Sequence, residues 1–415
     1  FLAREAEHVE GFAKECAIVT HTRLKNDKKD GVVVDPNSKL EEEIIVRPTS
    51  ETVIWSMYKK WIQSYRDLPI LINQWANVVR WEMKTRLFLR TSEFLWQEGH
   101  TAHETREEAK KETLDILELY RRLAEDHLAV PVFTGVKTDS EKFAGAEKTY
   151  CIEAMMGDKR ALQAGTSHNL GQNFAKAFDV KFQTKDNKEQ FVWATSWGVS
   201  TRLIGAVILT HGDDKGLRLP PKIAPVQIVI VPISKNDEDK NAIKLFLDPI
   251  IKSLIAVGVR THVDWTNNTP GYKFNEWEMK GVPLRMEVGP RDIENDKVVL
   301  VRRDLGEKIL LSKQEVLSAV PKLLEKIQNN LFAQAKEFRD INTHFVSTYN
   351  EFCSLIKTGG SVRCGWDGSS KTESKIKEDT KATIRCIPFD EEPEGLLCVF
   401  SGKPAKHEVI FAKAY

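Results

Sequence analysis

Residues 88–103 read FLRTSEFLWQEGHTAH and contain several of the aromatic and β-branched residues that are enriched in strands. Because side chains alternate along a β-strand, every second residue here is predicted to point to one face. That row consists of Arg90, Ser92, Phe94, Trp96, Glu98 and His100. Two aromatic rings, an acid and an imidazole in one row suit the wall of a pocket that holds a small cation against apolar surface. A half-exposed amphipathic strand is the alternative that the pattern leaves open.

The preceding run, residues 72–81, is also rich in β-forming residues, and the polar segment 82–86 separates the two runs. We therefore predict a long antiparallel hairpin. Arg80 lies where the first strand becomes polar. Taken alone, that residue is equally well interpreted as a solvated arginine at a strand end.

Helical patterns flank the predicted hairpin on both sides. After Pro48-Thr49-Ser50, residues 51–65 carry apolar side chains at helical spacing. Residues 106–128 combine many charged side chains with one apolar stripe, which is typical of a surface helix packed on a sheet.

The chain divides into three predicted domains. Residues 216–225 (GLRLPPKIAP) are proline-rich without periodicity and mark a boundary. The apolar run 227–233 (QIVIVPI) is typical of a strand buried on both faces, and alternating helix and strand signals follow it. We expect domains at 1–220, 225–338 and 340–415. Within the last, the glycine-, serine- and charge-rich residues 359–379 are predicted to form a loop or mobile insert.

Composition limits the possible functions. The 415 residues are 41% apolar and 29% charged, which suits a soluble globular protein, and no apolar run reaches the roughly 18–20 residues of a membrane span. The 61 basic residues nearly cancel the 60 acidic ones, so any contact with nucleic acid needs a local patch. Six widely spaced cysteines without a C-x-x-C pair favour reduced thiols in a reducing compartment.

Several blocks together resemble one family. In chain order they are RPTSET (47–52), VVRWE (78–82), the hairpin strand 88–103, GTSHNLGQNF (165–174), SWGVSTRLIGA (196–206), HGDDKGLRLPP (211–221) and GYKFNEWEMKGVPLRMEVGPRD (271–292). This order resembles class II prolyl-tRNA synthetases of the eukaryotic and archaeal type over nearly the whole chain. The resemblance implies an α+β catalytic domain, built as an antiparallel sheet flanked by helices. A three-layer α/β anticodon-binding domain and a small α/β C-terminal domain would follow.

The resemblance also implies a reaction: ATP with Mg²⁺ activates L-proline to prolyl-adenylate, and the prolyl group then passes to tRNA(Pro). The first step is a displacement at the α-phosphate and requires fixed positive charge there. Arg80 and Arg202 are the implied catalytic residues, and a forked guanidinium suits an anion that must be held at two points. Arg202 also lies in the first turn of a predicted helix, where anions are favoured. An exposed helix arginine is the simpler alternative.

The implied binding residues fall into two overlapping sets. Proline would contact Thr49, Glu51, Arg80, Phe94, Trp96, Glu98, His100, Phe143 and His168. ATP would contact Arg80, Glu82, Arg90, Thr91, Phe94, Gln163, Thr166, Thr201 and Arg202. Without the resemblance, Glu51 is explained by the helix dipole, which favours an acid in the first turn, and His168 is most simply a structural histidine.

The α/β unit resembles the anticodon-binding domain of class IIa synthetases. Prolyl anticodons share two guanines, which suit basic side chains on one base edge and a carboxylate on the other. The candidate RNA-binding residues are Lys273, Phe274, Glu278 and Lys280, with the Phe274 ring as a stacking platform. Packing of Phe274 and Trp277 in the core is the alternative.

The C-terminal domain departs from the four-cysteine zinc site that the family often carries. Cys364 and Cys398 stand near the expected places, but the nearby second cysteines are missing. Cys386 and His407 lack the spacing of metal ligands. We therefore expect no structural zinc and no metal ligand among the protein side chains.

The remaining expectations also follow from the resemblance. They are a homodimer, whose central interface motif is not recognisable here, a cytoplasmic location and no membrane partner. Two alternatives to a proline enzyme stay open: another class IIa synthetase, for threonine, glycine or histidine, and a non-catalytic synthetase-like protein that binds RNA or regulates translation. A generic nucleotide-binding protein is disfavoured because no Gly-rich phosphate loop is present.

Overall fold

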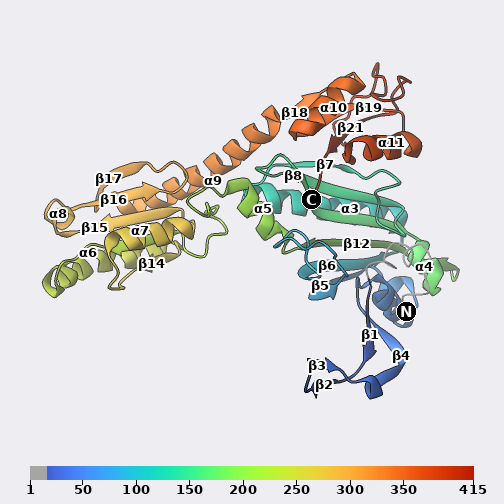
Figure 1. Ribbon diagram of the computed structural model, residues 1–415, viewed down its shortest axis with the longest axis horizontal. Coiled ribbons are helices and arrows are strands. Elements are labelled where there is room, and N and C mark those ends of the chain that lie inside the picture. The colour runs from blue at the N-terminus through green and yellow to red at the C-terminus, as the bar shows by residue number, and fades with distance from the viewer. Residues whose placement is uncertain (1–15) are drawn as a thin grey trace.

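The computed structural model describes residues 16–415, which form a large twisted sheet, an α/β unit beside it and a projecting β-arm (Figure 1). The large sheet has ten strands in the order β18-β19-β21-β20-β7-β8-β9-β12-β6-β5. A separate five-stranded sheet, in the order β14-β13-β15-β16-β17, lies in the α/β unit.

Six antiparallel strands form the half of the large sheet that carries the predicted hairpin. They are β5 (Ile70–Val79), β6 (Glu93–His103), β7 (Val132–Val136), β8 (Lys148–Met155), β9 (Ala161–Gly171) and β12 (Trp193–Ser200). The pairing of β5 with β6 confirms the hairpin. Its second strand begins later than predicted, because Phe88 adopts a positive φ of 60° and the chain turns back between Arg86 and Arg90. Arg90 therefore lies in the connecting loop and not in the strand row.

Four helices accompany these strands: α2 (Glu51–Trp61), α3 (Arg106–Arg122), α4 (Asn173–Phe178) and α5 (Arg202–His211). A capping box between Thr105 and Glu108 starts α3, and a π-helical turn, η4 (Leu123–His127), extends it. The apolar stripe of α3, including Leu117 and Tyr120, packs on the sheet as the charge pattern predicted.

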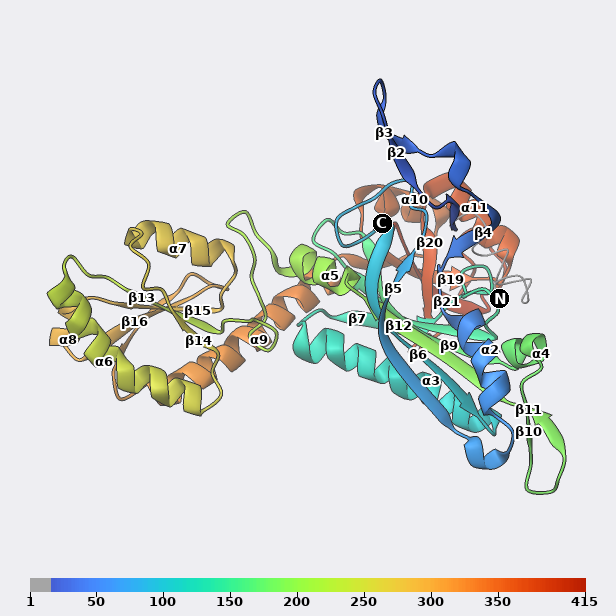
Figure 2. The same cartoon turned by 90° about the horizontal axis from the view of Figure 1, so that it is seen from below.

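The β-arm comprises residues 17–46 and projects from the body of the molecule (Figure 2). It contains β1 (Ala17–His21), β2 (Leu24–Asp27), β3 (Gly31–Val34), η2 (Pro36–Ser38) and β4 (Lys39–Val46). Three other short elements accompany the six-stranded half of the large sheet. They are η3 (Tyr65–Asp67), β10 (Lys181–Gln183) and β11 (Glu189–Phe191).

The α/β unit has the three layers that its sequence predicted. Its strands are β13 (Ile228–Pro232), β14 (Thr261–Val263), β15 (Leu284–Val288), β16 (Lys297–Arg302) and β17 (Lys308–Ser312). Its helices are α6 (Asp237–Ala256), α7 (Pro270–Met279), α8 (Pro290–Glu294) and α9 (Val316–Ile341). Alternate residues of β13 face opposite layers: Ile228 and Ile230 pack with α6 and α9, whereas Val229 and Val231 pack toward α7.

The C-terminal unit extends the large sheet. Its elements are β18 (Thr343–Phe345), α10 (Tyr349–Thr358), β19 (Ser361–Trp366), α11 (Ser370–Thr380), β20 (Thr383–Pro388) and β21 (His407–Ala412). Strand β20 pairs with β7, and a Cβ at Gly135 would meet the Ile387 carbonyl oxygen at 2.2 Å, so only glycine allows this close approach.

The prediction of a loop at residues 359–379 is wrong, since β19 and α11 occupy most of this segment. Only Thr372, Glu373 and Ile376 of α11 are buried. Most side chains of α11 are exposed and polar, so they dominate the composition of the segment. The three buried residues are too few to give a recognisable helical pattern. Among residues 16–415, no helix has the length and apolar character needed to cross a bilayer.

Candidate active site

A cavity of about 210 Å³ lies on the face of the large sheet that is opposite α3. The orientation follows from β6, where Gln97 accepts a hydrogen bond from Tyr120 of α3 at 2.7 Å while its neighbours Trp96 and Glu98 line the cavity. Of the predicted binding residues, the structure brings together here Thr49, Glu51, Arg80, Phe94, Trp96, Glu98, His100, Phe143, Gln163, Thr166, His168 and Arg202.

One end of the cavity contains a buried hydrogen-bond network around the Glu98 carboxylate. One oxygen, Oε1, accepts from Ser50 Oγ at 2.5 Å and from Gln74 Nε2 at 2.6 Å. The other oxygen lies 2.9 Å from His100 Nε2. Such a carboxylate is costly to bury unless its lone pairs are satisfied, and these partners satisfy them.

A second buried acid, Glu51, begins α2 beside this network. The Thr49 hydroxyl donates to the Glu51 carboxylate, and both residues line the cavity. The position in the first helical turn stabilises the negative charge. An acceptor pair of this kind is suited to a protonated amine.

The pKa values of the two histidines of the cavity are shifted in opposite directions. Burial alone lowers the pKa of His100, but the hydrogen bond to the Glu98 carboxylate and the charges of Glu51 and Glu98 raise it above its ordinary value. Burial lowers the pKa of His168 to about 4, so this ring is neutral near pH 7. Phe143 stacks on the His168 ring with centroids 4.5 Å apart, which gives this side an apolar surface.

Two arginines also line the cavity. Arg80 Nε donates to the Pro48 carbonyl at 3.0 Å, and its guanidinium lies 5.2 Å from the Phe94 ring centroid. Arg202 Nε donates to the Leu89 carbonyl at 3.0 Å. Burial, followed by the nearby positive charge of Arg80, lowers the pKa of Arg202. A bound anion would relieve both effects.

Several residues that line the cavity carry a buried polar atom that lacks a hydrogen-bond partner within residues 16–415. They are Trp96 Nε1, His100 Nδ1 and Ser196 Oγ, each from a residue that lines the cavity. Buried donors and acceptors without partners are uncommon in folded proteins. These three atoms therefore leave hydrogen-bonding capacity unused in residues that line the cavity.

Four predicted ATP residues do not line the cavity: Glu82, Arg90, Thr91 and Thr201. Arg90 forms an ion pair with Glu82 at 3.3 Å in the hairpin loop, and its side chain is half exposed. Thr201 lies at the N-cap of α5, directly before Arg202. Glu82 and Thr201 lie within two residues of Arg80 and Arg202, respectively, in the sequence, and those two arginines do line the cavity.

Sequence reasoning missed other residues that line the cavity, among them Glu141, Thr149, Ser196 and Ser200. Ser196 and Ser200 lie an even number of residues apart in β12, so the alternation that identified the β6 row would have found them. Glu141 lies in the loop between β7 and β8, where no periodic signal exists.

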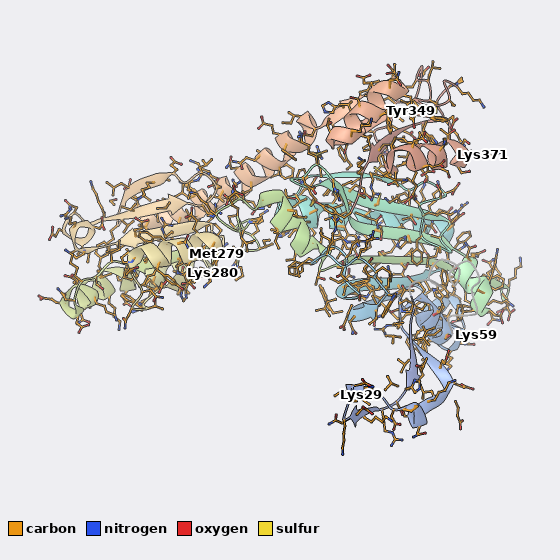
Figure 3. All side chains as sticks on the ribbon, viewed as in Figure 1. Lys29, Lys59, Met279, Lys280, Tyr349 and Lys371 are labelled. Carbon is orange, nitrogen blue, oxygen red and sulfur yellow. The ribbon has the colours of Figure 1, made fainter. Side chains whose placement is uncertain are left out.

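The candidate RNA-binding residues cluster around α7, but they do not share one environment. Lys273 is buried and donates to the Asp264 carbonyl at 2.9 Å. Phe274 packs against the sheet with Trp277, as the alternative interpretation held, and Arg285 lies 4.3 Å from its ring centroid. Glu278 contributes with Arg285 to a separate cavity of about 160 Å³, and Lys280 lies at the end of α7 (Figure 3).

The cysteines of the C-terminal unit form no metal-like cluster. Cys364 and Cys398 are both buried, and burial raises the pKa of the Cys364 thiol. Cys386 packs with Cys151, while His407 lies 3.1 Å from the Glu391 carboxylate. Within residues 16–415, no group of three or more His, Cys, Asp or Glu side chains has the arrangement of a metal site.

Three family models match the chain in the order of its structural units. The tRNA synthetase class II core domain (G, H, P, S and T) matches residues 33–211, the anticodon binding domain matches residues 227–323, and the prolyl-tRNA synthetase C-terminal domain matches residues 349–415. The antiparallel sheet with its arginine-containing cavity thus defines a class II aminoacyl-tRNA synthetase.

Similar curated proteins narrow the class. The chain is 58% identical to a proline–tRNA ligase of Bacteroides fragilis over 421 aligned residues, which cover 100% of this chain and 85% of the relative. The proline–tRNA ligases of Cytophaga hutchinsonii and Porphyromonas gingivalis are 56% and 58% identical with the same coverage. The chain belongs to the proline–tRNA ligase family.

Proposed function

We propose that the chain activates L-proline with ATP to form prolyl-adenylate and transfers the prolyl group to tRNA(Pro). The observation that carries the proposal is one cavity whose lining includes Arg80, Arg202 and the acid-and-aromatic row of β6. Family membership supports the same assignment. The residue roles below rest on this geometry.

Proline would bind at the end that contains the two buried acids. Its protonated secondary amine has two N–H donors, for which Thr49 Oγ1 and the Glu51 carboxylate are acceptors. The ring would lie against Phe143 and the neutral His168, with Phe94 and Trp96 on the other side. Glu98 and His100 would fix the pocket floor through their hydrogen bond.

The carboxylate of proline would then attack the α-phosphorus of ATP. A new C(=O)–O–P bond forms, the bond to the bridging oxygen of pyrophosphate breaks, and pyrophosphate leaves with the electron pair. Arg80 would bridge the attacking carboxylate and the α-phosphate, and Arg202 would hold the phosphate tail. Fixed positive charge that is already in place stabilises this transition state without reorganisation.

The other predicted ATP residues would surround the nucleotide. Gln163 and Thr166 line the cavity next to Arg202, while Glu82, Arg90, Thr91 and Thr201 would complete the site from its open side. Magnesium accompanies the phosphates of ATP in this chemistry. Since residues 16–415 offer no cage of side chains for a metal, the ion would depend on ATP for most of its ligands.

Transfer to tRNA would use the α/β unit to recognise the anticodon. Phe274, Glu278 and Lys280 on α7 remain the proposed RNA contacts. Lys273 differs from them because its ammonium is buried against Asp264, so we propose that it supports the loop before α7 and does not touch RNA. The cavity beside Glu278 supplies additional basic groups.

The test is proline-dependent exchange of labelled pyrophosphate into ATP. We expect activity in the wild type and a loss of kcat/KM of at least about 100-fold in Arg80→Ala, as is typical when a charge partner of the transition state is removed. Arg66→Ala, at an exposed arginine beside Tyr65, is the matched control and should retain full activity. Equal rates in wild type and Arg80→Ala would exclude the assigned role of Arg80.

The same assay separates the alternatives. Exchange with threonine, glycine or histidine in place of proline would indicate another class IIa specificity. Absence of exchange with every amino acid would favour a non-catalytic protein.

We also propose three finer properties: a homodimer, a cytoplasmic location and no structural zinc. Sedimentation at micromolar concentration tests the first, since a monomer would contradict it. Fractionation of cells tests the second. One tightly held zinc per chain in elemental analysis would contradict the third, which rests on the environments of Cys364 and Cys398.

A further inference from the structure

The loop between β7 and β8 connects the C-terminal unit to the cavity. On its inner side, the loop contributes Glu141 and Phe143 to the cavity lining. Phe143 stacks on His168, and its backbone N–H donates to Thr149 Oγ1 at 2.9 Å. Thr149 Oγ1 is in turn 3.0 Å from His168 Nδ1. The position of this loop therefore fixes one wall of the proposed proline pocket.

The outer side of the same loop is held by helix α11. The buried carboxylate of Glu373 accepts hydrogen bonds from the hydroxyls of Thr138, at 2.9 Å, and Ser140. Lys377, one turn later on the helix, forms an ion pair with Glu141 at 3.0 Å. Helix α11 thus contacts the segment that directly precedes Phe143.

The start of the loop is also joined to the C-terminal unit. The Lys137 ammonium donates to the Arg385 carbonyl at 2.7 Å and forms an ion pair with Glu153 at 2.6 Å. The Arg385 guanidinium completes this buried cluster with a 3.0 Å contact to Glu153. The attachment at Lys137 is therefore rigid, and the contacts of Glu373 extend it toward the cavity.

Glu373 is an unusual residue for this place. Its side chain is buried, with 4% of the residue exposed, although a carboxylate loses much hydration energy on burial. Its place in the first turn of α11 stabilises the charge, and the two hydroxyls supply hydrogen bonds. A carboxylate in this setting fixes the direction of both hydroxyls, whereas an apolar residue would only fill the space.

We infer that Glu373 is a positioning residue for proline binding, and that the C-terminal unit acts through it to hold the β7–β8 loop against the cavity. The inference rests on the proposed placement of proline beside Phe143 and His168. When the loop is released, only a fraction of the molecules has the pocket wall in place, and the apparent affinity for proline falls by that fraction.

The first experiment measures proline-dependent pyrophosphate exchange in the full chain with Glu373→Ala. We expect the KM for proline to rise about tenfold, while kcat and the KM for ATP stay within about twofold of the wild type. Glu373→Gln keeps one acceptor oxygen and should restore most of the affinity. Loss of stability alone would lower the active fraction, and therefore kcat, without this change in KM.

The matched control is Glu378→Ala. Glu378 lies on the exposed side of α11, where it forms an ion pair with Lys375 at 3.0 Å. Lys371 marks the first turn of the same helix in Figure 3. This variant should keep the wild-type KM for proline. An increase equal to that of Glu373→Ala would overturn the inference, since it would show a general effect of the helix.

A second variant tests the other side of the same contact. Thr138→Val combined with Ser140→Ala removes both donors and should raise the KM for proline to a similar extent. Adding Glu373→Ala to this pair should cause little further increase, because all three changes break one contact. Additive increases, or an unchanged KM in either variant, would overturn the inference.

Phe143→Ala distinguishes this inference from the proposed function. If this variant raises the KM for proline but Glu373→Ala does not, the positioning role fails and the proposed pocket stands. If Phe143→Ala leaves the KM for proline unchanged, the placement of proline beside this ring is wrong, and the inference fails with it.

Discussion

Two parts of the cavity lining differ in their electrostatics: the surroundings of the Glu98 carboxylate, and the surroundings of the arginines Arg80 and Arg202. At the proposed proline end, the Glu98 carboxylate is surrounded by donors from Ser50, Gln74 and His100. Where the phosphates are proposed to bind, Arg202 donates to main-chain carbonyls, and burial, followed by the positive charge of Arg80, lowers the pKa of Arg202. The hydrogen bonds of Glu98 are complete before any ligand binds, whereas the two arginines carry positive charge that an anion would balance.

This difference indicates how substitutions should act. A buried hydrogen-bond network, such as the one around the Glu98 carboxylate, fixes the shape of the pocket. Substitutions in it should therefore alter the affinity for the amino acid and the stability of the fold. Unbalanced positive charge contributes most when negative charge moves in the transition state, so changes there should alter the rate. The predictions below separate these two effects.

The largest effect is expected at the phosphate end. Arg202→Ala should lower kcat/KM for ATP in pyrophosphate exchange by about 100-fold or more, because a buried guanidinium is lost from the site of the phosphates. Arg202→Lys keeps the charge but not the fork, and should be intermediate. Single-substrate titrations of ATP at saturating proline measure both. If Arg202→Ala changed only the KM for proline, the assignment of Arg202 to the phosphates of ATP would be contradicted.

A smaller effect, on stability, is expected at the proline end. His168 has a folded-state pKa of about 4 against an ordinary value of 6.5, so the unfolded chain takes up a proton first as the pH falls. Stability is unaffected above pH 6.5 and should decline between pH 6.5 and 4. His168→Gln should reduce this decline by about 1–2 kcal/mol between pH 6.5 and 5.

Urea unfolding at the two pH values measures this change. His211 is the comparison residue, since burial also lowers its pKa to about 4 although it lies on α5 and hydrogen-bonds to the Leu128 carbonyl. His211→Gln should therefore reduce the decline without altering proline affinity. An identical pH dependence in wild type and His168→Gln would refute the neutral state of His168.

The smallest effect on the cavity should come from the α/β unit. Phe274→Ala should leave pyrophosphate exchange within about twofold of the wild type, since that assay needs no tRNA. The KM for tRNA(Pro) in aminoacylation should rise about tenfold, the size expected for loss of one base-stacking platform. A parallel loss in both assays would indicate that Phe274 acts only in packing.

The predictability of this molecule varies with the range of its interactions. The row Phe94, Trp96, Glu98 and His100 was predictable because one strand imposes a period of two on residues close in sequence, and the structure places all four in the cavity. The same rule would have found Ser196, where it was not applied. His168 lies in one of the residue blocks that carry the family resemblance, whereas Phe143 was implied by the resemblance as a whole.

Other features had no local signal. The contact of Glu373 with Thr138 joins residues 235 positions apart, and no periodicity links them. Helix α11 was mistaken for a loop because most of its side chains face water, so its composition resembles that of a mobile segment. The burial of Lys273 was equally unpredictable, because a lysine is usually exposed and its ion pair with Asp264 is known only from the structure.

The junction of β20 with β7 has a consequence for shortened forms of the chain. Because this pairing makes the last part of the polypeptide a portion of the same sheet as the catalytic strands, a premature stop codon before residue 383 would remove the neighbour of β7. The uncovered strand would present free backbone donors and acceptors, which recruit other chains into aggregates. A chain truncated at this point should therefore accumulate as an insoluble fragment and not as a smaller active enzyme.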